Sequence, residues 1–125
     1  MENYTAVMLE PYLLDKDGVT GIPMVQPKLL KDAVVALDDA DFQVHFHASG
    51  DGAIRQSLNA IQAARDHNDP SDGRHHISHL QIIHSEDTPR FAALDVVANF
   101  QPLWACADDY INELTLPFIC EETAR

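Results

Sequence analysis

Two histidines, His47 and His79, occupy equivalent places in two short segments of the chain. His47 closes the apolar run 42–47, and His79 lies near the end of a second run, 76–80. If both runs are neighbouring parallel strands, their carboxyl ends meet at one sheet edge, where α/β proteins place their ligands. Neutral imidazole is the commonest protein ligand for zinc-like metals. The pattern therefore predicts a metal site with His47 and His79 as ligands.

Other residues near these two leave alternatives open. His45 precedes His47 by two positions, so both side chains could reach one ion, or one of them could pack in the core. Asp51 could cap the following helix or orient His47. The turn 48–52 could bind an anion through its amides, although turn geometry and capping explain it as well. Trp104 could line a pocket or pack in the core. The remaining histidines are expected at turns, at the surface or at a helix end: His67, His75, His76 and His84.

The elements that would position these residues alternate between helix and strand. Apolar spacing predicts helices from residue 27 to about 39–41, from 51 to about 65, and from 87–89 onward, and strands at 42–47, 76–80 and 96–101. This order is typical of an α/β fold with a parallel sheet, and it brings Gln101 to the edge of the two histidines. We expect one domain over 1–125, with an irregular lead-in at 1–26 and a tail at 103–125 that holds a short helix near 108–114.

Composition excludes several classes of protein. The net charge of −12 would repel nucleic acid and anionic lipid. Cys106 and Cys120 form no CxxC pair, so neither a disulfide framework nor a cysteine zinc site is predicted. No signal peptide is recognised, and no window approaches the ~18 apolar residues of a membrane span. We therefore expect a cytoplasmic chain that binds neither nucleic acid nor membrane.

As an ordered set, several segments resemble the metal-dependent amidohydrolase superfamily, in particular amidohydrolase family 3, which includes proteins similar to N-substituted formamide deformylase. These segments are residues 8–12, 47–53, 74–79, 89–91 and 100–102. The resemblance implies a portion of a (β/α)8 barrel of the TIM type, about strands five to seven. It also implies hydrolysis of a carbon–nitrogen bond in a small amide-like molecule by metal-activated water. His47 and His79 would be the metal ligands of the fifth and sixth strands, with zinc as the first choice of metal.

The chain departs from the pattern of that family in ways that bear on activity. Gly52 stands where relatives commonly have a basic residue, and Ser78 where they commonly have glutamate. The early HxH motif, the ligand of the fourth strand and the late aspartate that serves as general base lie outside these residues. A full barrel needs about 250 residues, so we expect a piece of a longer enzyme that is inactive alone. The competing interpretation is an inactive α/β fragment or interaction module, whose histidines are remnants and whose strand edges promote self-association.

Overall fold

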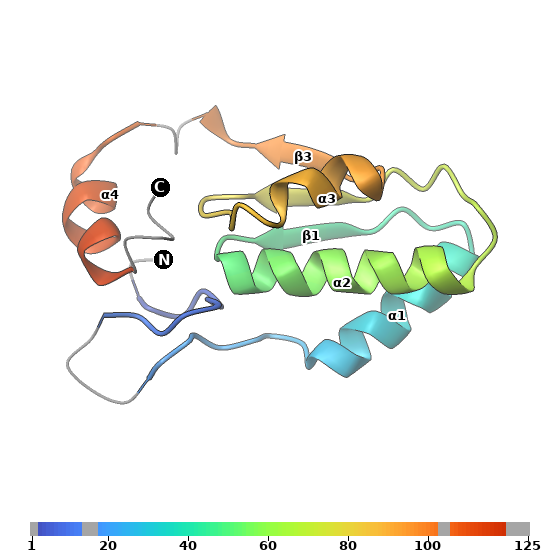
Figure 1. The fold of residues 1–125 in the computed structure, drawn as a ribbon, viewed down its shortest axis with the longest axis horizontal. Helices are drawn as coiled ribbons and strands as arrows, with labels where there is room; N and C mark the ends of the chain where they lie inside the picture. The colour runs from blue at the N-terminus through green and yellow to red at the C-terminus, as the bar shows by residue number, and fades with distance from the viewer. Residues whose placement is uncertain (1–2, 14–17, 103–105, 120–125) are drawn as a thin grey trace.

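The computed structural model describes residues 3–13, 18–102 and 106–119, and within them the predicted alternation is confirmed (Figure 1). The helices and strands follow in the order α1 (Pro27–Asp39), β1 (His45–Ala48), α2 (Asp51–His67), β2 (His76–His79), α3 (Thr88–Ala93) and β3 (Val97–Phe100). The predicted short helix of the tail is α4 (Asp109–Leu114), and a 3-10 turn, η2 (Leu116–Phe118), follows it. Strand β1 begins three residues later than the apolar run predicts. Trp104 and Cys120 lie outside the described residues.

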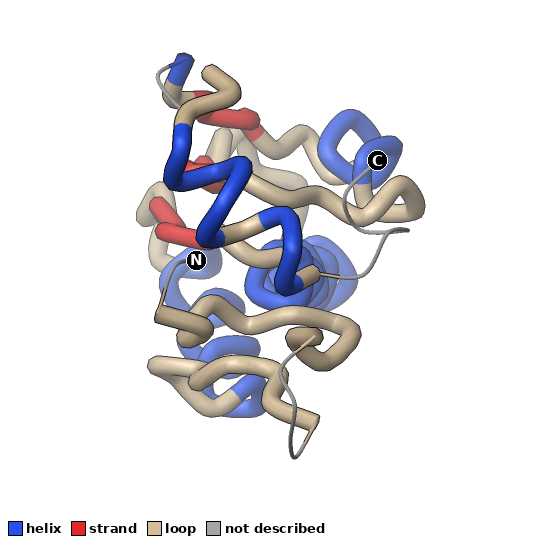
Figure 2. The backbone as a smooth tube through the Cα atoms, turned by 90° about the vertical axis from the view of Figure 1, so that its left-hand side faces the viewer, coloured by secondary structure: helices blue, strands red, loops and turns tan. Residues whose placement is uncertain are grey.

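The three strands form one parallel sheet in the order β1-β2-β3, which confirms the predicted fold class. His45 is level with His76, and His47 is level with Ser78. Figure 2 looks at the sheet from the carboxyl ends of the strands, with the strands stacked in a column, α2 and α3 on one side of it and α1 below it. We call the other side of the sheet its open face.

Helix α2 provides the centre of the hydrophobic core. Ile54, Leu58 and Ile61 recur at helical spacing and are completely buried, as the sequence predicts. They pack against Phe46 and Ile77, which point from β1 and β2 toward the helices. Removing such side chains from water is the main force that holds a helix on a sheet. The core thus fixes the two strands that carry the histidines.

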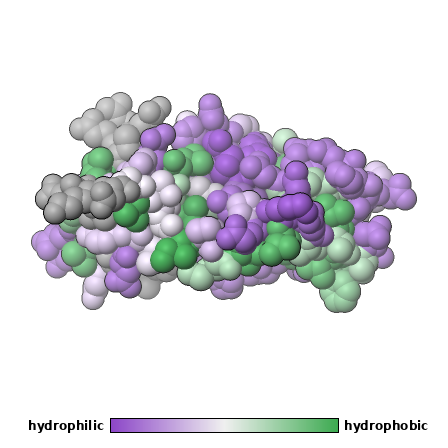
Figure 3. Space-filling model, turned by 90° about the horizontal axis from the view of Figure 1, so that it is seen from below, coloured by the Kyte–Doolittle hydropathy of each residue, from purple (hydrophilic) through white to green (hydrophobic). Residues whose placement is uncertain are grey.

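The prediction for the buried face of α1 is correct only in part. Val34 is buried and Leu30 half-buried, but Leu29 is 61% and Leu37 40% exposed. Helix α1 packs on α2, so only the stripe that contains Leu30, Val34 and Asp38 is covered. Figure 3, seen from the side of α1 and the lead-in, shows apolar patches among polar ones on this surface.

His75 is completely buried, so its expected place in a surface turn is wrong. Its Nδ1 accepts a hydrogen bond from the Val44 amide at 3.1 Å, which requires an unprotonated Nδ1. The proton is then on Nε2, which donates to Oδ1 of Asp38 at 3.0 Å. Both bonds are satisfied by the neutral ring. Burial, the largest influence, lowers the pKa of His75, and the hydrogen bond to Asp38 only partly opposes it.

Asp38 is the acceptor at the centre of this buried network. Asn68 donates to its Oδ2 at 2.9 Å, Ser71 donates to its Oδ1 at 2.8 Å, and the Arg65 guanidinium lies 3.6 Å away. Burial opposes ionisation of Asp38, but the hydrogen bonds from Asn68, Ser71 and His75 outweigh it and lower the pKa of the carboxyl group. The network joins α1 to the end of α2 and to the segment before β2.

The neutral state of His75 predicts a loss of stability in mild acid. In the folded protein the pKa of His75 lies below its ordinary value of 6.5, so below about that pH the unfolded chain binds more protons. The free energy of unfolding should therefore fall as the pH drops below 6.5, and the loss should level off once the folded-state pKa is passed. Each unit of pKa difference contributes about 1.4 kcal/mol.

Urea unfolding at pH 7 and pH 5.5 measures this loss, with His75→Gln as the comparison. Glutamine retains an N–H donor near Asp38 but has no titrating ring. We expect the natural protein to lose more stability than the variant between the two pH values. Equal losses in both proteins would show that His75 does not contribute.

The lead-in has no helix or strand in its described residues, 3–13 and 18–26, and it is held against the start of α2. The buried carboxylate of Asp51 accepts hydrogen bonds from the Leu9 amide at 2.9 Å and from the Gly52 amide at 2.7 Å. The Ala53 amide donates to the Val7 carbonyl oxygen at 3.1 Å. Asp51 is thus the first residue of α2, its N-cap is Gly50, and its carboxylate anchors the lead-in. Asp51 therefore does not serve as the N-cap of α2, as the sequence suggested, and its carboxylate instead binds the Leu9 amide of the lead-in.

The absence of a side chain at Gly52 is what permits this close contact. A Cβ at Gly52 would lie 2.7 Å from the carbonyl carbon of Met8 and 2.8 Å from its oxygen. Both atoms belong to the backbone, so this part of the lead-in would have to move.

Gly52→Ala is therefore expected to destabilise the protein, although alanine is the better helix former. Crowding of this kind costs about 1–3 kcal/mol, more than the 0.5–1 kcal/mol that alanine gains in a helix. Hydrogen exchange at the Leu9 and Ala53 amides should accelerate in the variant. Unchanged exchange at both amides would show that the lead-in tolerates a Cβ.

No helix in the described part of the chain combines the length and apolar character that crossing a membrane requires.

Candidate metal centre

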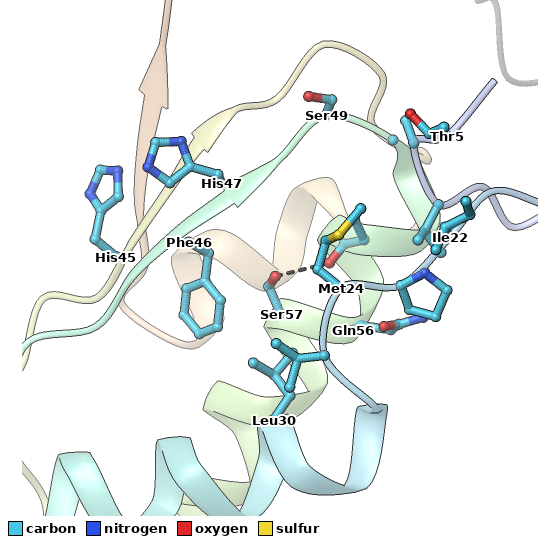
Figure 4. A pocket seen from close by; sticks show the side chains of 16 residues that line it. Thr5, Ile22, Met24, Leu30, His45, Phe46, His47, Ser49, Gln56 and Ser57 are labelled. Atoms are coloured by element: carbon cyan, nitrogen blue, oxygen red, sulfur yellow. Dashed lines mark hydrogen bonds between the residues drawn. The ribbon is translucent and has the colours of Figure 1, made fainter. Parts of the chain in front are cut away.

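The open face of the sheet carries the two histidines of β1. Exposure alternates along this strand, with His45 and His47 exposed and Phe46 and Ala48 buried. Figure 4 shows the two imidazole rings on one side of β1 and Phe46 on the other side. This is the two-residue period of a strand whose helix-covered face is apolar.

His79 reaches the same place through an unusual backbone conformation. It is level with Ala48, so regular alternation would turn its side chain toward the helices. Instead, φ is +75° at His79 and +50° at Leu80, which places both residues in the left-handed region. This region is uncommon for residues other than glycine, and such strain is concentrated at functional sites. The turned backbone redirects the His79 ring to the open face.

As a result, the two predicted site residues meet. Nδ1 of His47 and Nε2 of His79 are 2.8 Å apart, a hydrogen bond in which one ring donates and the other accepts. Burial is the largest influence that lowers the pKa of His79, the charge of His47 lowers it further, and the hydrogen bond with Gln101 partly opposes both. The contact with Gln101 also confirms that the end of β3 lies at this edge of the sheet.

The neighbourhood of the pair decides among the alternatives that the sequence leaves open. Asp51 is engaged by backbone amides of Leu9 and Gly52, so its described hydrogen bonds do not orient His47. The Gly52 and Ala53 amides have acceptors within the protein, which leaves fewer N–H groups for an anion at this turn. Among the described residues, no three His, Cys, Asp or Glu side chains are grouped to hold a metal ion. The pair is therefore a two-donor arrangement.

A buried carboxylate fixes the segment that follows His79. Asp87 is completely buried, and it accepts hydrogen bonds from Nε of Arg55 at 2.6 and 2.7 Å and from Nη1 of Arg90 at 2.9 Å. Nη2 of Arg90 also donates to Asn59 on α2. Hydrogen bonds between charged groups are stronger than those between neutral groups. They tie the loop between His79 and α3 to α2.

A cavity of about 440 Å³ adjoins the site between the lead-in, α1, β1 and α2 (Figure 4). His45, His47 and Ser49 are among the polar residues that line it. Met24, Leu30 and Phe46 are among the apolar residues of its wall. Its size is in the range of small-molecule sites.

The remaining histidines divide between the two faces and the surface. His76 begins β2, at the start of the predicted strand 76–80, and is half-buried on the open face. His67 ends α2 with its Nδ1 2.9 Å from the Ala63 carbonyl oxygen, as expected for a helix terminus. His84 lies in the loop after β2, where its Nδ1 is 3.4 Å from Nη2 of Arg55.

The parallel βα units define an α/β protein in which two imidazoles meet at the carboxyl ends of neighbouring strands. Residues 1–117 match the model of the amidohydrolase family, and the chain belongs to that family. It is 31% identical over 98 residues to Protein LONG AFTER FAR-RED 3 of Arabidopsis thaliana. The aligned residues make up 78% of this chain and 17% of that protein. It is 32% identical over 107 residues to Exoenzymes regulatory protein AepA of Pectobacterium carotovorum, and the aligned residues make up 84% of this chain and 22% of that protein.

A solved structure shares the fold. An uncharacterised metal-dependent hydrolase from Pyrococcus furiosus superposes on 98% of this chain with a TM-score of 0.74 and 22% identity, and the match covers 24% of that hydrolase. The chain thus spans about a fifth of the length of its curated relatives and a quarter of this structure.

Proposed function

We propose that this chain is a segment of a metal-dependent amidohydrolase in which Nδ1 of His47 and Nε2 of His79 bind one divalent metal ion. The enzyme would hydrolyse a carbon–nitrogen bond in a small, amide-like molecule. The observation that carries the proposal is the convergence of these two nitrogen atoms to 2.8 Å, which depends on the left-handed backbone at His79. A core packing role for His79 would not need that conformation.

The donor set suits a zinc-like ion. In a tetrahedral zinc site two imidazole nitrogens lie about 3.3 Å apart, since each Zn–N bond is about 2.0–2.1 Å long. The present separation of 2.8 Å is shorter because a hydrogen bond joins the two nitrogen atoms. Small rotations of the His47 and His79 rings would increase the distance between the two nitrogen atoms. Two imidazoles leave coordination positions for further ligands and water, as a catalytic site requires.

Each part of the chain has a distinct task in this proposal. A divalent metal held here would acidify water and polarise the carbonyl oxygen of the substrate. His47 and His79 hold and orient that ion, and the Arg55–Asp87–Arg90 cluster keeps the loop after His79 in place. The cavity beside His47 would accept the apolar part of the substrate. By the family resemblance, N-formyl and N-acyl amines are the first substrates to test.

In the same proposal the segment occupies about strands five to seven of a TIM-type barrel. The two outer strands, β1 and β3, then have partner strands outside this segment, and all four residues of β3 are exposed here. In isolation the two edges would favour self-association. We also propose that the isolated chain is inactive, because two histidines alone supply no general base. Turnover of an N-acyl amine that is abolished by a chelator and by His47→Ala would contradict this.

Zinc titration with elemental analysis tests the metal proposal directly. The purified chain is compared with the His47→Ala/His79→Ala double variant, and with His67→Ala/His84→Ala as the matched control away from the open face. We expect tight zinc binding in the natural chain and the control, and only weaker binding in the double variant. Binding of equal affinity in all three would place the zinc elsewhere. No binding in any of them would favour the inactive-fragment interpretation.

A further inference from the structure

Four imidazole rings follow one another across the open face of the sheet. From His76 to His45 the ring centroids are 5.7 Å apart, from His45 to His47 they are 5.1 Å apart, and from His47 to His79 they are 4.9 Å apart. We call these four side chains the imidazole row. The proposed function uses only the His47–His79 end of it, so the other end requires its own explanation.

The His45 ring is held in a defined tautomer. The Ser78 hydroxyl donates its hydrogen to the Phe46 carbonyl oxygen at 3.0 Å. Its oxygen is then the acceptor in the contact with Nε2 of His45 at 3.1 Å, so Nε2 carries the hydrogen. Nδ1 of the neutral ring therefore retains a lone pair. Ser78 is almost completely buried, which makes this support rigid.

This arrangement is the one that orients histidine ligands in metal sites. A ligating imidazole usually donates its second N–H group to an oxygen atom nearby, and this contact fixes the tautomer and the ring. Here the oxygen belongs to the Ser78 hydroxyl on the neighbouring strand β2.

His76 lies directly beside His45. The two residues are partners in the register of the parallel strands, and both point to the open face. Neighbouring strands are about 4.8 Å apart, so two paired imidazoles can bind the same ion with modest ring rotations. Water can complete the coordination because His45 is exposed and His76 only half-buried.

We propose that Nδ1 of His45 and the ring of His76 bind a second divalent transition-metal ion, separate from the ion at His47 and His79. Imidazole donors favour copper(II) over nickel(II) and zinc among such ions. The affinity should be lower than at the first site, because the rings of His45 and His76 meet edge to face at 78° and must rotate. Ser78 acts as a positioning residue that holds His45.

The test isolates the second site by removing the first. The His47→Ala/His79→Ala variant is titrated with copper(II) and with zinc by calorimetry, and the copper complex is examined by electron paramagnetic resonance. We expect one remaining equivalent of metal and nitrogen hyperfine structure from imidazole. Both should be lost when His45→Ala/His76→Ala is added. In the same background, Ser78→Ala should weaken binding by about tenfold or more, whereas His67→Ala/His84→Ala should leave it unchanged.

Circular dichroism of each variant shows whether the chain still folds, and only folded variants are compared. If the His47→Ala/His79→Ala variant binds no metal, or if its binding survives His45→Ala/His76→Ala, the second site is wrong. Neither result bears on the site at His47 and His79. The His45→Ala/His76→Ala variant retains only that site and therefore tests it separately. Loss of all binding in that variant, with retention in the His47→Ala/His79→Ala variant, would instead overturn the proposed function.

Discussion

Asp38→Ala is expected to lower the free energy of unfolding by about 3–5 kcal/mol, the usual cost of removing one partner of a buried charged network. Asp38 is only 3% exposed, and its carboxylate accepts hydrogen bonds from Asn68, Ser71 and His75. Without it, these donors and the Arg65 guanidinium at 3.6 Å lose their common acceptor in a buried place. Urea unfolding at pH 7 measures the loss.

The neighbouring aspartate is a matched control. Asp39 is exposed at the end of the same helix, so Asp39→Ala should change stability by no more than about 0.5 kcal/mol. Asp38→Asn keeps the size of the side chain and one acceptor oxygen, and its effect should lie between the two. Similar losses for Asp38→Ala and Asp39→Ala would show that the buried network contributes little.

Zinc is expected to stabilise the folded chain strongly. An ion that binds the folded state alone at 100 times its Kd raises the free energy of unfolding by about 2.7 kcal/mol. The melting temperature should rise when zinc is added and return to its starting value with a chelator. His47→Ala/His79→Ala should lose most of this gain, and the weaker site at His45 and His76 should provide the small remainder.

Magnesium serves as the control ion, because it prefers oxygen ligands and should not bind two imidazoles. An equal rise of the melting temperature with magnesium would indicate a general effect of cations on a chain of net charge −12. A rise with zinc that is as large in the double variant as in the natural chain would exclude His47 and His79 as its source.

Much of the fold can be predicted from sequence because its helices and strands are regular. The helical spacing of Ile54, Leu58 and Ile61 identifies α2 and its buried face. Alternation of helix with strand predicts the parallel sheet, and thereby the edge where His47, His79 and Gln101 come together. The family resemblance independently selects the same two histidines.

Two features depend on contacts or conformations that no local pattern contains. His79 reaches His47 only because its backbone is left-handed, and strand alternation alone would send it to the opposite face. His75 is buried because Asp38, far away in the sequence, provides an acceptor for it. A signal for the second feature does exist in the sequence, since Asp38 continues the buried stripe of Leu30 and Val34 on α1. A carboxylate at such a position requires buried donors.

Side-chain nitrogen NMR tests the central claim most directly, because it identifies the atoms that bind the metal. A long-range proton–nitrogen spectrum of the histidine rings is recorded before and after one equivalent of zinc. We expect the Nδ1 signal of His47 and the Nε2 signal of His79 to shift together, while His67 and His84 remain unchanged. A shift at only one of the two rings, or shifts confined to His67 or His84, would contradict a shared metal site at His47 and His79.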